Sequence, residues 1–176
     1  DEEFGGLAGP AWLLERKLTK PDFVIAAGFS YGIVTAHNGC LQLELTVHGR
    51  AGHGAMPESG RDAIRAANVV LTKLYAYANG LNAKRSSVTG ITSPTLNVGL
   101  ISGGINTNVV PDKVSIKIDR RMIPEEDVAE VEAQLRQVIE SAVVGLDGIR
   151  VEIRRMLLSH ALQPRPGHEK LVAALS

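Results

Sequence analysis

The chain has 176 residues, of which 44% are hydrophobic, and its 19 basic and 19 acidic side chains leave no formal net charge at pH 7. This length and composition suffice for one well-packed core, and the balanced charge argues against nucleic acid or an acidic membrane as a partner. No apolar run is long enough to span a bilayer, and the first residues lack the pattern of a signal peptide, so we expect a cytoplasmic protein. Cys40 is the single cysteine, which excludes an internal disulfide and a thiolate zinc cluster. Its place just before an apolar strand predicts a buried structural thiol rather than a nucleophile.

The first 36 residues and the last 16 predict pieces of a second domain. Residues 7–18 predict a short helix interrupted early by Pro10, and residues 23–27 predict a buried strand. A helix followed by a buried strand is typical of a larger α/β layer. At the other end a proline-rich linker precedes the start of a helix at 169–175. We expect three units, at residues 1–36, 37–160 and 161–176.

The middle of the chain alternates between strand and helix periodicity. Apolar residues alternate with polar ones over residues 41–47, which predicts a strand with one buried face. Apolar residues at helical spacing follow, in a segment opened by Pro57 and closed by Asn79-Gly80, and predict a helix. Alternation over residues 95–100 predicts a second strand, which ends at Gly103-Gly104.

The second half of this middle region repeats the scheme in a different order. Residues 114–118 predict a third strand, and Pro124 with the acidic residues after it predicts the start of a helix that runs to Ala142. Residues 149–153 predict the last strand. The order β-α-β-β-α-β predicts an α+β fold of the ferredoxin-like type, a four-stranded antiparallel sheet with both helices on one face.

Three polar side chains stand out around these elements. His53 follows the first strand in the run Gly52-His53-Gly54, Asn108 precedes Val109-Val110-Pro111, and Arg121 ends the third strand. An imidazole, an amide and a guanidinium are groups that hold a carboxylate or a developing oxyanion. The alternatives are a loop histidine that caps a helix, an ordinary turn asparagine and a surface arginine. Arg120 should face the opposite side of the strand from Arg121 and is interpreted as structural.

Four motifs occur along the chain in a fixed order and carry a resemblance. They are Asp1-Glu2-Glu3 with Gly5-Gly6, Gly49-x-x-Gly52-His53-x-x-x-Pro57, Gly103-Gly104-x-x-x-Asn108-Val109-Val110-Pro111-Asp112, and Asp119-x-Arg121. With them the chain resembles the zinc metallopeptidase family of acetylornithine deacetylase, succinyl-diaminopimelate desuccinylase, aminoacylase and glutamate carboxypeptidase. The resemblance implies that residues 37–160 are the lid domain through which members of this family form homodimers. The flanks would then be fragments of the catalytic domain.

The resemblance also implies roles for individual residues. Glu2 would be the general base that activates a zinc-bound water, and Glu3 a zinc ligand. His53 would reach into the partner subunit's active site and donate a hydrogen bond to the scissile carbonyl. Asn108 and Arg121 would hold the substrate's carboxylate or carbonyl. The implied cofactor is zinc, with cobalt or manganese as other divalent metals, and the implied substrate is a small N-acyl amino acid or short peptide with a free carboxylate.

The sequence departs from this family at the metal site. The family also uses a His-x-Asp strand end upstream and a histidine far downstream, and neither is among these residues. An acidic ligand is expected after residues 23–27, but the chain reads Ala26-Ala27-Gly28-Phe29-Ser30. Either the parent protein uses a different ligand there, or its second zinc is weak or absent. We expect this chain alone to be inactive and to hold no zinc tightly.

Two other classes of function stay open at this point. One is a stand-alone ferredoxin-like dimerisation module without chemistry, and the other is an amino-acid-binding regulatory domain with the same order of elements. The fold alone does not separate them from a lid domain. The Glu2-Glu3 pair and His53 do, because neither alternative needs them.

Overall fold

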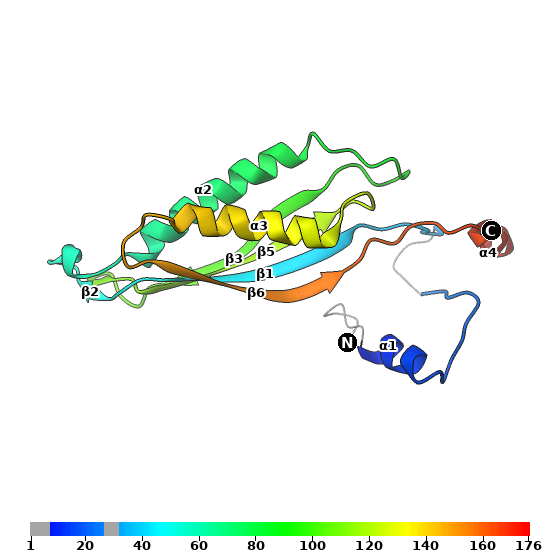
Figure 1. Cartoon of the computed structure of the whole chain (residues 1–176), viewed down its shortest axis with the longest axis horizontal. Helices are drawn as coiled ribbons and strands as arrows, with labels where there is room; N and C mark the ends of the chain where they lie inside the picture. Colours follow the sequence, from blue (N-terminus) through cyan, green and yellow to red (C-terminus); the bar gives the residue numbers. More distant parts are fainter. Residues whose placement is uncertain (1–7, 27–31) are drawn as a thin grey trace.

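A computed structural model describes residues 8–26 and 32–176, and its centre is a four-stranded antiparallel sheet with strand order β3-β5-β1-β6 (Figure 1). The strands are β1 (Gly39–His48), β3 (Thr95–Gly103), β5 (Lys113–Met122) and β6 (Arg150–Ser159). The helices α2 (Ala63–Leu81) and α3 (Val128–Val143) lie side by side on one face of the sheet (Figure 1). The predicted ferredoxin-like α+β fold is confirmed.

The core lies between this face of the sheet and the two helices. The alternation in β1 places every second side chain in it, and β5 does the same, so both central strands are anchored along their whole length. The helices add the apolar stripe predicted by their spacing. Burying each leucine or isoleucine side chain fully contributes about 1.5–3 kcal/mol. The fully buried members are Leu41, Leu43, Leu45, Val47, Ala63, Val70, Leu74, Ile116, Leu135 and Ile139.

Both long helices begin later than their proline signals predict. Pro57–Ser59 forms only a 3-10 turn, η2, and α2 starts after Asp62, whose carboxylate accepts a hydrogen bond from the N–H of Arg65. Asp127 caps α3 in the same way. An aspartate at the N-cap satisfies the first free N–H groups, and a proline several residues upstream cannot do that.

The helix α2 also continues past the predicted stop at Asn79-Gly80 and ends at Leu81. Leu81 is only 3% exposed, and its burial offsets the cost of a glycine inside the helix.

A short ribbon at one tip of the molecule was not predicted. It consists of β2 (Gly52–His53) and β4 (Val109–Val110), which pair antiparallel. Figure 1 shows β2 at the end of the domain opposite α4. Two-residue strands are too short to show a period, so only the three-dimensional pairing reveals them.

The flanking segments lie beyond the other end of the sheet. They contain α1 (Ala8–Glu15) and α4 (His168–Leu175), both close to their predicted ranges. His37 and Leu162 exchange two backbone hydrogen bonds of 3.2 and 3.1 Å, so the chain enters and leaves the sheet domain side by side (Figure 1). The three predicted units stay a prediction.

The predicted buried strand at residues 23–27 is wrong for the part that the structure describes. Residues 23–26 form no strand, and Phe23, Val24 and Ile25 are 55%, 75% and 65% exposed. A buried strand needs neighbours that pair with it, and no described strand lies beside these residues. Among the described residues, no helix has both the length and the apolar character needed to cross a membrane.

Candidate functional site

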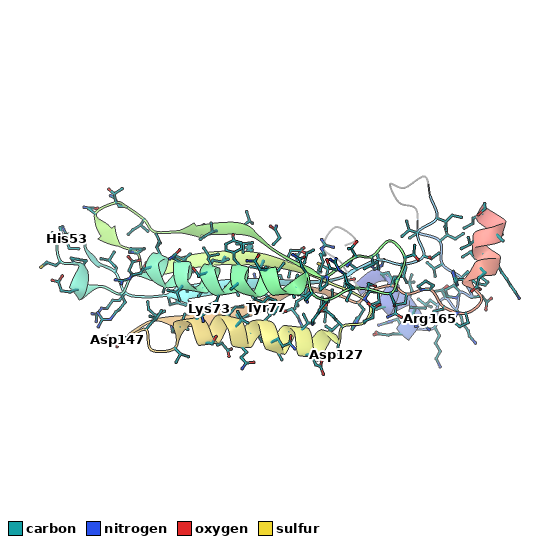
Figure 2. All side chains as sticks on the ribbon, turned by 90° about the horizontal axis from the view of Figure 1, so that it is seen from above. His53, Lys73, Tyr77, Asp127, Asp147 and Arg165 are labelled. Atoms are coloured by element: carbon teal, nitrogen blue, oxygen red, sulfur yellow. The ribbon has the colours of Figure 1, made fainter. Side chains whose placement is uncertain are left out.

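The tip ribbon brings together two of the predicted site residues. His53 in β2 pairs with Val109 in β4, and the N–H of Gly54 donates a 2.7 Å hydrogen bond to the carbonyl of Asn108. His53 and Asn108 are 55 positions apart in the sequence, yet His53 lies in β2 and Asn108 directly precedes the neighbouring strand β4. Both side chains are exposed, and Figure 2 shows His53 projecting at the extreme end of the molecule. The two residues therefore form one polar tip.

A backbone hydrogen bond assigns the tautomer of His53. The N–H of Ala55 donates to Nδ1 of His53 over 3.1 Å, so in the neutral ring Nδ1 is the acceptor and the proton lies on Nε2. Within residues 8–26 and 32–176 no group accepts from Nε2, so its N–H is an available hydrogen-bond donor on an exposed side chain. A donor in this state matches the role that the resemblance implies, because a carbonyl oxygen that gains negative charge needs a hydrogen-bond donor.

Close backbone contacts leave no room for a Cβ atom on either side of His53. A Cβ at position 52 would lie 2.7 Å from the backbone nitrogen of Gly60, and a Cβ at position 54 would lie 3.0 Å from the carbonyl oxygen of Asn108. Both contacts are to backbone, which cannot move aside as a flexible side chain can. The Gly-His-Gly run is therefore what allows His53 to sit between two closely packed chain segments.

Arg121 lies at the opposite end of the sheet. It is the next-to-last residue of β5 and pairs with Cys40 of β1, near the junction at His37. Its guanidinium is about half exposed and makes two hydrogen bonds to the carboxylate of Asp119, from Nε over 2.7 Å and from Nη2 over 3.2 Å. It borders an open depression of about 530 Å³ on the face of the sheet without helices. The other residues that line this depression are His37, Asn38, Cys40, Gln42, Leu157 and Ser159.

Asp119 was not singled out as a functional residue by sequence reasoning, although the signal was present. Residues two apart on a strand share a face, and Asp119-x-Arg121 therefore predicts a contact between the two side chains. Asp119 also accepts a 3.0 Å hydrogen bond from Nε2 of Gln42. The carboxylate thus fixes the orientation of Arg121 on the sheet.

The structure confirms the structural role predicted for Arg120. Its side chain is fully buried on the helix side of β5, and Nη2 contacts Oε1 of Glu126 over 2.7 Å. Cys40 is buried as well, as predicted. Burial, followed by the negative charge of Asp119, raises the pKa of the Cys40 thiol to about 11. The thiol is therefore protonated at neutral pH and is not a nucleophile.

The polar tip and Arg121 are too far apart to act on one small molecule within a single chain. The strand β5 has 10 residues and runs from the tip side of the sheet to Arg121. At a rise of about 3.4 Å per residue, its two ends are about 30 Å apart. The structure therefore groups His53 with Asn108 and separates both from Arg121.

The predicted metal ligand cannot be placed, because Glu2 and Glu3 lie outside the described residues, as do Ala27 and Gly28. Within residues 8–26 and 32–176, no group of three or more histidine, cysteine, aspartate or glutamate side chains is arranged to hold a metal ion. The described residues therefore do not fit a zinc site, and the roles argued for His53, Asn108 and Arg121 do not depend on one.

Comparison with known protein families identifies the family of this chain. Residues 35–146 match the M20 peptidase dimerisation domain. The chain belongs to this family. The fold agrees with that membership, and the resemblance found in the sequence is confirmed.

Individual relatives of this peptidase dimerisation domain are longer proteins. The chain is 28% identical over 120 residues to N-acetyldiaminopimelate deacetylase of Leuconostoc mesenteroides, covering 68% of this chain and 29% of the relative. It is 31% identical over 173 residues to acetylornithine deacetylase of Myxococcus xanthus, covering 96% of this chain and 45% of the relative. The chain thus spans less than half the length of the curated relatives that it matches.

Solved structures of longer proteins also match this chain over only part of their own length. An aminobenzoyl-glutamate utilization protein from Klebsiella pneumoniae matches with a TM-score of 0.56 and 28% identity, over 73% of this chain and 30% of that one. A hydantoinase/carbamoylase family amidase from Burkholderia ambifaria matches with a TM-score of 0.61 and 25% identity, over 81% of this chain and 33% of that one.

Proposed function

We propose that this chain is the lid and dimerisation portion of a zinc-dependent amidohydrolase or peptidase. The substrate class is a small N-acyl amino acid or short peptide with a free carboxylate. Family membership and the two relatives named as deacetylases support this proposal. Residues 37–160 would be the lid, and residues 1–36 and 161–176 would belong to the catalytic domain. Glu2 as general base and Glu3 as zinc ligand keep the roles that the resemblance implies.

The two edges of the sheet differ in a way that favours one of them as the dimer contact. The outer strand β6 carries four charged side chains, at positions 150, 152, 154 and 155, which disfavour pairing with another strand. The outer strand β3 carries none, and Leu100 and Ile101 in it are 63% and 56% exposed. An uncharged apolar edge strand is open to pairing with a second copy.

Apolar residues beside β3 enlarge this surface. Ile105 is 80% exposed just after the strand, and Ile64 of α2 packs next to Gly104 and is half exposed. We call Ile64, Leu100, Ile101 and Ile105 the β3 edge surface. Antiparallel pairing of two β3 strands about a twofold axis would bury this surface and join the two sheets.

The observation that carries the proposal is the separation of His53 from Arg121 by the length of the sheet. One active site needs both, so each site would combine the polar tip of one subunit with Arg121 of the other. The His53 Nε2–H would donate to the scissile carbonyl as it becomes an oxyanion, and the Asn108 amide would add a second donor. Arg121, held by Asp119, would bind the substrate's carboxylate through two parallel hydrogen bonds.

A complementation experiment tests this arrangement in a polypeptide that joins this chain to its catalytic segments. The variants His53→Ala and Arg121→Ala are each expected to lose activity, with kcat of His53→Ala falling about 10²–10³-fold because an oxyanion donor is lost. Mixing the two under conditions of subunit exchange gives mixed dimers that contain one intact site. Random exchange should therefore restore about a quarter of wild-type activity.

The control is each variant mixed with itself, which should restore nothing. If the mixed sample also stays inactive while subunit exchange is demonstrated, the site does not combine residues of two subunits and the proposal is wrong.

A further inference from the structure

The loop that carries His53 is closed at its base by two arginines. Arg50 and Arg61 pair through their backbones, with N–H to carbonyl distances of 2.9 and 2.7 Å. Residues 51–60 between them form a closed loop that includes β2 and η2. The position of His53 therefore depends on how this loop is fixed to the rest of the domain.

The side chain of Arg61 provides that fixation. Its Nη1 donates to the carbonyl of Gly60 over 2.8 Å and to the carbonyl of Glu58 over 3.3 Å. Its Nε and Nη2 donate to the carboxylate of Asp147 over 2.9 and 2.5 Å. Asp147 lies in the turn between α3 and β6, outside the loop, and Figure 2 shows it at the same end of the molecule as His53. One guanidinium thus ties the loop backbone to the body of the domain.

Close backbone contacts connect Arg61 to His53. Gly60, whose carbonyl Arg61 holds, lies so close to Gly52 that a Cβ on Gly52 would be 2.7 Å from the Gly60 nitrogen. Gly52 directly precedes His53. Moving the Gly60 segment therefore moves the backbone of His53 and the Ala55 N–H that sets its tautomer.

We propose that Arg61 and Asp147 are a positioning pair that holds the His53 loop, and with it the Nε2–H donor, in its working orientation. This inference rests on the proposed function of His53. Neither residue touches the reacting atoms, so both act through His53. A donor displaced by about 1 Å can cost up to about 100-fold in rate.

Arg136 offers a matched control. Its side chain is 33% exposed against 32% for Arg61, and it also makes two hydrogen bonds to one carboxylate, that of Glu132, and one to a backbone carbonyl, that of Ile153. It ties α3 to β6 rather than fixing the loop. Arg136→Ala therefore removes equivalent contacts without touching the tip.

The first test uses the 176-residue chain and the nitrogen chemical shifts of its histidines, together with amide exchange of Ala55. Wild type and Arg136→Ala should show His53 protonated at Nε2 and a protected Ala55 amide. Arg61→Ala should show mixed His53 tautomers and Ala55 exchange at least tenfold faster. Asp147→Ala, at an exposed turn, should change the His53 tautomer and the Ala55 exchange rate in the same direction to a smaller extent. This variant replaces Arg61→Ala in the test if Arg61→Ala does not fold. Unchanged tautomer and exchange in both variants would overturn the proposal.

The second test uses the complete enzyme and a double-mutant cycle. Arg61→Ala should lower kcat about ten- to 100-fold with KM changed less than twofold, because only the transition state needs the aligned donor. In a His53→Ala background, Arg61→Ala should have no further effect. An equal loss in both backgrounds would show that Arg61 does not act through His53. If His53→Ala is fully active while Arg61→Ala still loosens the loop, the proposed function fails and the positioning role stands.

Discussion

At the scale of single residues, we expect substitutions in the buried contact between Arg120 and Glu126 to lower the stability of the fold. Arg120 is fully buried and Glu126 nearly so, and Lys84 adds a 3.0 Å contact to the same carboxylate. Removing one partner of a buried ion pair leaves an uncompensated charge, whereas replacing both by apolar side chains is often neutral. We expect Glu126→Ala to lower the free energy of unfolding by about 3–5 kcal/mol, and the double replacement Arg120→Met, Glu126→Met to lower it by far less. Urea unfolding at pH 7 measures both.

The same carboxylate makes stability depend on pH. Burial alone would raise the pKa of Glu126, but hydrogen bonds from Arg120 and Lys84 outweigh it and hold that pKa below its ordinary value of 4.5. A carboxyl with a lowered pKa stabilises the fold above its ordinary pKa, and this contribution is lost as the pH falls through the folded value. Wild type should therefore lose stability below pH 4.5 more steeply than the double replacement. Equal slopes would contradict this assignment.

Cys40 gives a second prediction at this scale. Its thiol is buried and its pKa is raised to about 11, so little thiolate is present at pH 8. Alkylation by iodoacetamide should be at least tenfold slower in the folded chain than in 6 M urea, with free cysteine in the same buffers as the control. Folded-state labelling at the rate of free cysteine would mean that this end of β1 opens readily.

At the scale of elements, the β3 edge surface should decide the oligomeric state. A lysine there places a charge on an outer strand of the four-stranded sheet that has none, so Ile101→Lys should convert a dimer to a monomer in light scattering at about 50 μM. Met156→Lys on the other edge is the matched control, because Met156 is also exposed and β6 already carries charges. Dimers of Ile101→Lys with the stability of wild type would place the contact elsewhere.

The sequence predicted most of the elements because their signals are periodic. The alternation in β1 and β5 and the helical spacing in α2 and α3 result from the same core that the structure shows. The helix starts were misplaced because Asp62 and Asp127, not the prolines, supply the cap. The strand predicted at 23–27 is wrong for its described residues, 23–26, because apolar character alone does not provide a neighbouring strand.

The candidate site was only partly predictable for a related reason. His53, Asn108 and Arg121 were found through their motifs, but nothing in their order along the chain says which of them meet. That depends on the pairing of Gly52 with Val110 and on the length of β5, which are long-range properties. Arg61 and Asp147 were missed because their contact joins segments 86 residues apart.

At the scale of the whole molecule, the sheet domain has the polar tip at one end and Arg121 at the other. The junctions at His37 and Leu162 lie near Arg121, and the polar tip lies at the far end (Figure 1). The proposed two-subunit site would need a stiff domain to carry the tip, and two central strands of 10 residues each with a continuous buried face provide that stiffness.

The paired exit of the chain at His37 and Leu162 has a mechanical consequence. Because both connections leave at one place, a rotation of the domain about that place would move it as a single lever whose arm is about 30 Å long. A rotation of only about 10° at the pivot would carry the imidazole of His53 through roughly 5 Å, more than the length of a hydrogen bond. In the proposed two-subunit site, small changes in the backbone at positions 37 and 162, far from the tip, would therefore decide whether the His53 donor reaches the substrate.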